Sequence, residues 1–232
     1  MLSLCLIGVL GCREFRKEKY PGLTLITWTE NGYVVDKIEG DCTSVGKYRP
    51  KPIIDINNNN IKDSVELINN RFYLKEKKKL LWSSDTGFKV DNYVIGDINN
   101  DDEAELVLGL WKKNKYGQEL PFWEEKNVED YGYHIFIYKW QEDDLILIWG
   151  SSTIDLPVKE IRIVDINQDK KNELIVLEGS YEKPDSVFAE HISIWRWYGW
   201  NFFNDFRSDK GKYKGLDVRI DKEIEKICVR RF

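Results

Sequence analysis

Two nine-residue segments carry acidic and amide side chains at alternate positions, each just before an aliphatic run. The two sets are Asp97, Asn99, Asp101 and Glu105, and Asp165, Asn167, Asp169 and Glu173. Alternate residues of a tight loop can point at one ion, and Ca²⁺ takes six to eight oxygen ligands of these types. The spacing is therefore compatible with a metal site in each loop. The alternative is that the Asp and Asn side chains cap backbone N–H groups and hold the loops by hydrogen bonds alone.

Position six of each loop, where Gly would ease a sharp turn, is occupied by Asp102 in one loop and Lys170 in the other. A weaker copy of the segment begins at Asp55 and has Asn59 in place of the third acidic residue. A shortened copy begins at Asp221. We expect no calcium in these last two loops.

The elements around these loops also recur. The Asp55, Asp97 and Asp165 segments follow one another at intervals of 42 and 68 residues, which is typical of a repeat architecture with insertions. Three other segments end in Trp: GLTLITW, HIFIYKW and HISIWRW. Their aliphatic, aromatic or β-branched residues follow an alternating pattern, which predicts half-buried strands. Each is followed by turn residues and a further strand, which predicts hairpins. No amphipathic helix is expected between them.

These elements assemble into four-stranded units, covering about residues 51–84, 91–152 and 159–208. The C-terminal segment supplies the first two strands of a further unit, and the N-terminal segment supplies the last two. The predicted fold is all-β, a small β-propeller of four blades, each a four-stranded antiparallel sheet. The N- and C-terminal strands close the last blade, which hides sheet edges that an open array would expose.

Loops of the form D-x-N-x-D-x-x-x-E inside four-stranded units resemble those of the FG-GAP/VCBS repeat proteins, which are integrin alpha-like β-propellers. The resemblance covers most of residues 22–232, predicted here as a single domain. It implies structural calcium bound by side-chain oxygens at loop positions one, three, five and nine, and by a backbone carbonyl at position seven. For this chain those positions are the two sets of four residues named above.

The first twelve residues form an apolar run that ends in VLGC and resemble a bacterial lipoprotein signal. The resemblance implies that Cys12 is lipidated and becomes the mature N-terminus, with residues 13–21 as a short tether. We therefore expect a lipid-anchored protein on the periplasmic or extracellular face of a bacterial envelope. The alternative is a disordered or buried apolar N-terminus.

Export leaves Cys42 and Cys228 as the remaining cysteines, in an oxidising compartment. Both fall in the predicted split blade, toward the same face. They form either a disulfide that pins the closure or two buried thiols.

The long connection before His134 is rich in aromatic residues, namely Trp111, Tyr116, Phe122, Trp123 and Tyr131. An exposed aromatic cluster suits a glycan or protein partner, whereas the alternative is a satellite core beneath a long loop. His134 and His191, at equivalent strand starts, indicate a repeated structural role.

Charge and motifs limit the function classes. A net charge of -5 with scattered Lys and Arg argues against nucleic-acid binding. The sequence lacks nucleophile-elbow, zinc-protease, P-loop and dinucleotide motifs. It predicts a non-enzymatic recognition or scaffold module. The alternative is a carbohydrate-active protein, lectin-like or polysaccharide-hydrolysing, that uses the aromatic loops.

Overall fold

The computed structural model describes residues 22–48, 54–113 and 131–232. Within these ranges the chain forms β-strands and one short 3-10 turn, η1 (Cys42–Ser44), so the predicted all-β class is confirmed. The same ranges contain no helix with the length and apolar character needed to cross a membrane. The expected signal segment, Cys12 and the tether lie outside the described residues.

The strands form four antiparallel sheets. The first contains β4 (Asp63–Ile68), β5 (Arg71–Glu76) and β6 (Lys79–Ser83). The second contains β7 (Lys89–Gly96), β8 (Glu105–Lys113), β9 (Tyr131–Gln141) and β10 (Asp144–Gly150). The third contains β11 (Val158–Val164), β12 (Glu173–Glu178), β13 (His191–Trp197) and β14 (Phe202–Arg207). In the fourth are β1 (Gly22–Thr29), β2 (Gly32–Glu39), β3 (Lys47–Tyr48), β15 (Tyr213–Asp221) and β16 (Ile224–Arg231).

The fourth sheet joins the two ends of the chain, since β1 pairs with both β2 and β16. Two details differ from the four-stranded pattern that the sequence predicts. The two-residue strand β3 adds a fifth strand beside β15, and the first sheet has three described strands. The strand expected before Asp55 falls mainly on residues 49–53, outside the described ranges.

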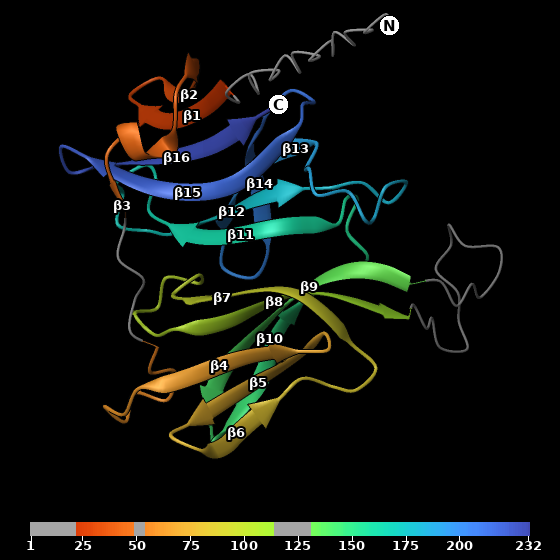
Figure 1. The fold of residues 1–232 in the computed structure, drawn as a ribbon. Helices are drawn as coiled ribbons and strands as arrows, with labels where there is room; N and C mark the ends of the chain where they lie inside the picture. Colours follow the sequence, from red (N-terminus) through yellow and green to blue (C-terminus); the bar gives the residue numbers. More distant parts are fainter. Residues whose placement is uncertain (1–21, 49–53, 114–130) are drawn as a thin grey trace, which may run out of the picture.

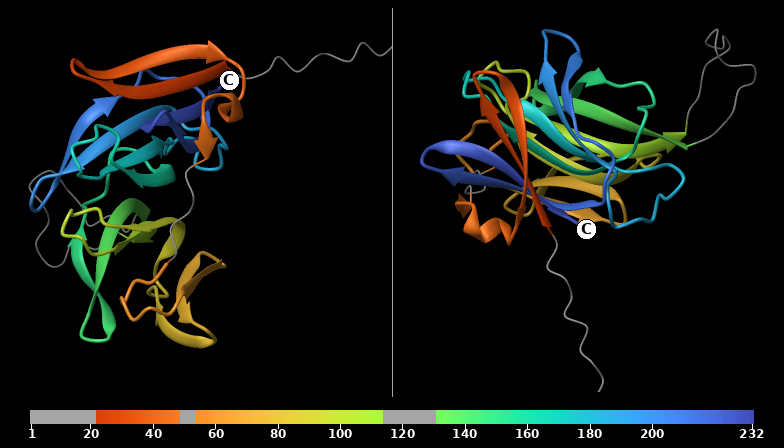
Figure 2. Two further views of the ribbon diagram at one scale, coloured as in Figure 1. Left: turned by 90° about the vertical axis from the view of Figure 1, so that its left-hand side faces the viewer. Right: turned by 90° about the horizontal axis from the view of Figure 1, so that it is seen from above.

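The sheets pack face to face in chain order, and Figure 1 shows the fourth sheet at one end of the stack and the first sheet at the other. Figure 2 gives the same order from a second side. One apolar core joins the first and second sheets, and a second core joins the second and third. A third core joins the third and fourth sheets. The inner strands β7, β11 and β15 lie at these junctions.

The strands that follow the Asp97 and Asp165 loops are buried on both faces. In β8 every residue from Glu105 to Leu110 is buried, and all of β12 is buried. A strand covered on both faces reads as a continuous apolar run, as in ELVLGL and ELIVLE. Position 109 of β8 requires Gly, because a Cβ there would collide with the hydroxyl of the fully buried Tyr133.

A serine closes the outer hairpin of three sheets in the same way. In the second sheet, the Nδ1–H of His134 donates to the Ser151 carbonyl at 3.0 Å, and Ser151 Oγ accepts the next backbone N–H. His191 and Ser208 repeat both contacts in the third sheet. In the first sheet Arg71 replaces His and donates to the Ser84 carbonyl. The two histidines therefore have the repeated structural position that the sequence indicates.

Cys42 in η1 and Cys228 in β16 are joined by a disulfide, with their Cα atoms 5.8 Å apart. Both cysteines are buried, in an apolar cluster that includes Leu23 of β1. The bond ties the segment after β2 to the last strand of the chain.

Candidate functional site

The acidic loop between β7 and β8 is built from side-chain to backbone hydrogen bonds. The two carboxylate oxygens of Asp97 accept the N–H groups of Asp101 and Asp102 at 3.1 and 3.0 Å. Asn99 Oδ1 accepts the same Asp101 N–H at 3.0 Å. Glu105 Oε2 accepts the Ile98 N–H at 3.0 Å and so ties the end of the loop to its start.

The loop between β11 and β12 has the same construction. Asp165 accepts the N–H groups of Asp169 and Lys170, at 3.2 and 2.9 Å, and Asn167 Oδ1 accepts from Asp169 at 2.9 Å. Glu173 Oε2 accepts the Ile166 N–H at 3.1 Å.

The loop before β4 repeats these bonds once more, with Asp55 accepting from Asn59 and Asn60. Here Asp63 Oδ2 accepts the Ile56 N–H at 2.9 Å. This bond joins the end of the loop to its start, as Glu105 and Glu173 do in the other two loops. Sequence reasoning missed this role of Asp63. The signal was present, because Asp63 follows Asp55 by the eight residues that separate Asp97 from Glu105.

Position six of all three loops has a left-handed backbone although it is not Gly. The φ values are 64° at Asn60, 68° at Asp102 and 66° at Lys170. Such a conformation costs an L-residue about 1–2 kcal/mol, least for Asn and Asp. The carboxylates of Asp55, Asp97 and Asp165 offset this cost, because each accepts a hydrogen bond from the backbone N–H of the position-six residue in its loop.

The two predicted calcium loops lie side by side. Asn172 donates its backbone N–H to Asn100 Oδ1 at 2.6 Å and its Nδ2 to the Asp97 carbonyl at 2.8 Å. The loops of the second and third sheets are therefore locked together at one edge of the molecule.

Lys139 of β9 brings a protein cation to the loop between β7 and β8. Its Nζ contacts Asp101, lies 2.8 Å from Glu103, and stands 3.8 Å from Glu105 Oε1. Burial alone would lower the pKa of Lys139, but the contacts with Asp101 and Glu103 raise that pKa above its usual range. Glu105 is itself fully buried, and desolvation raises its pKa to about 7. With an ammonium among its carboxylates, this loop does not fit a calcium ion.

The loop between β11 and β12 has a different charge balance. Arg196 stands opposite Glu173 in the register but forms its ion pair with Asp205, at 3.0 Å. Burial raises the pKa of Glu173 to about 8, with Asp169 and Asp165 adding to the rise. Its donor set therefore fits a cation better than that of the Lys139 loop. Within the described ranges, however, no three His, Cys, Asp or Glu side chains are grouped closely enough to hold a metal.

We expect the change Lys139→Met to destabilise the protein by about 2 kcal/mol, because a buried carboxylate loses its cation. Urea denaturation measures the loss. Lys75→Met is the matched control, since Lys75 pairs with the half-exposed Glu66 and such surface pairs contribute about 0–1 kcal/mol. Equal effects of the two changes would contradict the role given to Lys139.

The aromatic residues predicted for ligand binding are only partly described. Tyr116, Phe122 and Trp123 lie outside the described residues. Trp111 lies within β8, half-buried, and donates its Nε1–H to Asp91 at 2.6 Å. Its ring packs on Tyr133 and Tyr181, so Trp111 contributes to a core. Tyr131 is 43% exposed, with Lys89 over its ring.

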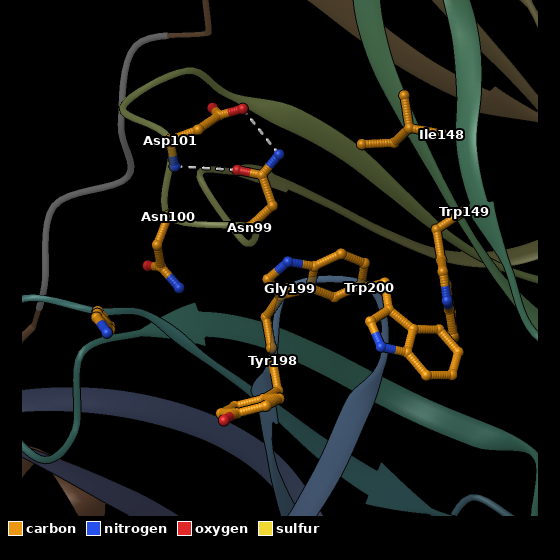
Figure 3. A pocket seen from close by; sticks show the side chains of 10 residues that line it. Asn99, Asn100, Asp101, Ile148, Trp149, Tyr198, Gly199 and Trp200 are labelled. Carbon is orange, nitrogen blue, oxygen red and sulfur yellow. Dashed lines mark hydrogen bonds between the residues drawn. The ribbon is translucent and has the colours of Figure 1, made fainter.

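A different aromatic group, which sequence reasoning missed, lines an open cleft of about 830 Å³ between the second and third sheets. Ile148 and Trp149 of β10 form one wall, and the turn from Trp197 to Trp200 forms another. The acidic-loop residues Asn99, Asn100 and Asp101 lie across from that turn (Figure 3). Lys171 completes the lining. We call this the aromatic cleft.

A second cleft, of about 630 Å³, has the equivalent place between the third and fourth sheets. Trp28 lies near the end of β1 as Trp197 ends β13, and Phe206 has the register position of Trp149. The recurrence of an aromatic pair between successive sheets was the signal in the sequence, since three of the predicted strands end in Trp.

No protein-family model matches this chain, and a search of curated proteins finds no significant relative. The functional argument therefore rests on the geometry of the loops and clefts.

Proposed function

We propose that this protein is a non-enzymatic binding module of the FG-GAP/VCBS type, a four-bladed β-propeller anchored by lipid at a bacterial envelope. The observation that carries the proposal is the recurrence of one hydrogen-bonded acidic corner at the same place in three successive sheets. Such a repeat is what a propeller blade needs, because each blade must turn its chain in the same way to stack on the next. The repeated serine contacts of the outer hairpins add support.

Closure of the propeller requires the first sheet to meet the fourth. The pairing of β1 with β16 completes the last blade from both chain ends, and closure would further bring the first sheet, which lies at the other end of the stack in Figure 1, against that blade. A small-angle scattering profile that fits an extended arc of sheets in solution would contradict closure.

The disulfide supports the location at the envelope. Disulfides persist in oxidising compartments such as the periplasm and the cell surface, and are rare in the cytosol. Cys42 and Cys228 are buried together, so their bond is shielded from reductants.

The binding role is supported by the two clefts, which open beside the acidic loops. Ligand sites are typically concave, largely apolar and equipped with a few polar groups, and their volumes run from about 300 to 1,000 Å³. Calcium, in this proposal, is structural and confined to the loop of Asp165, Asn167, Asp169 and Glu173, where it would neutralise three carboxylates.

Lipid anchoring is tested in a bacterial host that expresses the full chain and is fed an alkyne-bearing palmitate. We expect the label in the chain, with the protein in the membrane fraction. In the Cys12→Ser variant the label should be lost and the processed membrane form should not accumulate. An unlabelled parent chain, or label retained after Cys12→Ser, contradicts the anchoring proposal.

A further inference from the structure

Two aromatic side chains are exposed to solvent at the tip of the β13–β14 hairpin. Trp200 is 76% exposed and Tyr198 is 67% exposed. Exposed aromatic surface on this scale costs free energy unless a ligand covers it. The turn holds them in place, because Tyr198 N–H donates to the Asn201 carbonyl at 2.8 Å and Gly199 takes the left-handed φ of 71°.

The floor behind this tip is a fixed aromatic cluster. Trp149 and Trp197 meet edge to face with ring centroids 6.0 Å apart. Phe202 contacts both, at 5.3 and 5.0 Å. The aromatic cleft therefore offers flat apolar surfaces whose positions are set before any ligand binds.

The opposite side of the cleft offers hydrogen-bonding groups that are equally fixed. Asn99 Nδ2 donates to Asp101 Oδ2 at 2.9 Å, and the Asn172 N–H holds Asn100 through its Oδ1. These groups are two amides and a carboxylate, with the ammonium of Lys171 nearby. The lining carries one charge of each sign, so it complements a neutral ligand rather than a phosphate or a polyanion.

A ligand that matches both sides has an apolar face and a polar edge. Hexopyranose rings have this form, because their axial C–H groups gather on one face while their hydroxyls lie around the rim. Such a face can stack on an indole or phenol ring, and the hydroxyls can bond to amides and carboxylates.

The second cleft is a natural comparison, because its polar side carries an ion pair instead of two amides. Arg196 and Asp205 line it and pair with each other, at 3.0 Å. Its chain turn lacks counterparts of Tyr198 and Trp200, since Thr29 and Asn31 occupy the corresponding positions after Trp28.

We propose that the aromatic cleft binds a neutral oligosaccharide, with pyranose rings stacked on Trp200 and Tyr198 and hydroxyls bonded to Asn99, Asn100 and Asp101. This assignment rests on the proposed function as a binding module and names its ligand class and its site. It places the ligand on the face of the acidic loops, away from the Trp111 segment.

The test screens the full chain against an array of neutral oligosaccharides that contains hexamers of glucose, mannose and N-acetylglucosamine. Calorimetry then measures the affinity of the best hexamer for the parent and for three variants. We expect Trp200→Ala to weaken binding at least tenfold, which is about 1.4 kcal/mol of binding free energy, because the main stacking surface is removed. Trp28→Ala, in the second cleft, and Trp123→Ala, in the long loop, should leave the affinity within twofold.

Three results would overturn the proposal. One is no binding to any neutral oligosaccharide on the array. The second is binding that Trp123→Ala abolishes and Trp200→Ala leaves unchanged. The third is preferential binding of a proline-rich peptide, run in parallel because such peptides also stack on aromatic rings. The palmitate experiment is independent of all three, so a failure of the saccharide assignment is distinguishable from a failure of the envelope proposal.

Discussion

Replacing Cys42 and Cys228 by Ala together should lower the free energy of unfolding by about 5 kcal/mol. The disulfide joins residues separated by 186 positions. In the chain-entropy account, a loop of this length in the unfolded chain is worth about 5 kcal/mol. Domains are stable by only about 5–15 kcal/mol in total, so this single bond is a large share of the balance.

In the folded chain, the disulfide also helps to hold the N-terminal hairpin against its sheet. The strand β1 pairs with β16 over five residues, from Gly22 to Ile26, and brings β2 with it. Without the bond, this N-terminal hairpin is held to the sheet by β16 and its core contacts alone. Alanine is the replacement of choice, because Leu23 and the other apolar neighbours would leave a serine hydroxyl without a partner.

Guanidinium denaturation of the parent and the double variant measures the difference, and thermal unfolding should show a decrease of about 10–20 °C. Each single variant should lose as much as the double variant, since either change removes the bond. The parent, reduced while unfolded and then refolded with reductant present, should match the double variant. A double variant within about 1 kcal/mol of the parent would contradict the role of the disulfide.

The sequence is most informative where structure is local. The acidic corners could be predicted at Asp97 and Asp165 because all their capping bonds join residues within nine positions. The strands that contain Trp28, Trp140 and Trp197 were predictable for the same reason, since alternation of apolar residues is a local signal, although β9 is buried over most of its length.

The contacts that could not be predicted depend on strand register and on the packing of one sheet against the next. Ser151 meets His134 across 17 positions, and only the pairing of β9 with β10 brings them together. Lys139 reaches the Asp101 loop from 38 positions away, and no local pattern marks it as the counter-charge. The aromatic cleft needs Trp149 and Trp197, which belong to different sheets. Tertiary packing decides these contacts, and a reading of periodicity cannot supply them.

The closing Glu of the β11–β12 loop should make stability depend on pH. Desolvation of the buried side chain raises the pKa of Glu173 from the ordinary value of 4.5 to about 8. Below pH 4.5 the folded and unfolded chains both hold this proton. Between 4.5 and about 8 the unfolded chain releases it while the folded chain keeps it, so stability falls as pH rises. The full difference is up to about 5 kcal/mol.

Calcium should act in the opposite direction, because it binds the ionised carboxylates and removes their mutual repulsion. If the loop of Asp165 and Glu173 binds calcium, the ion should stabilise the folded chain more at pH 9 than at pH 5. In that case protons and calcium compete for one buried carboxylate.

The variant Glu173→Gln separates these effects. An amide keeps a hydrogen-bond acceptor for the Ile166 N–H but does not titrate, so the variant should lose most of the decline in stability between pH 5 and pH 9. Without calcium, it should be more stable than the parent at pH 9. Glu105→Gln is the matched comparison and should show a smaller effect, because the pKa of Glu105 rises only to about 7 and Lys139 lies close.

Urea denaturation at pH 5, 7 and 9, with a chelator or with 1 mM calcium (about the affinity range of weak extracellular sites), measures both dependences. Parallel pH profiles for the parent and Glu173→Gln would mean that Glu173 is ionised in the folded chain, contrary to the argument from burial. A calcium effect at pH 9 that survives Glu173→Gln would place the ion elsewhere. If calcium has no effect on the parent, the loop is held by its hydrogen bonds alone. Glu173 then serves as a buried acid that closes the corner, as Asp63 does in the first sheet.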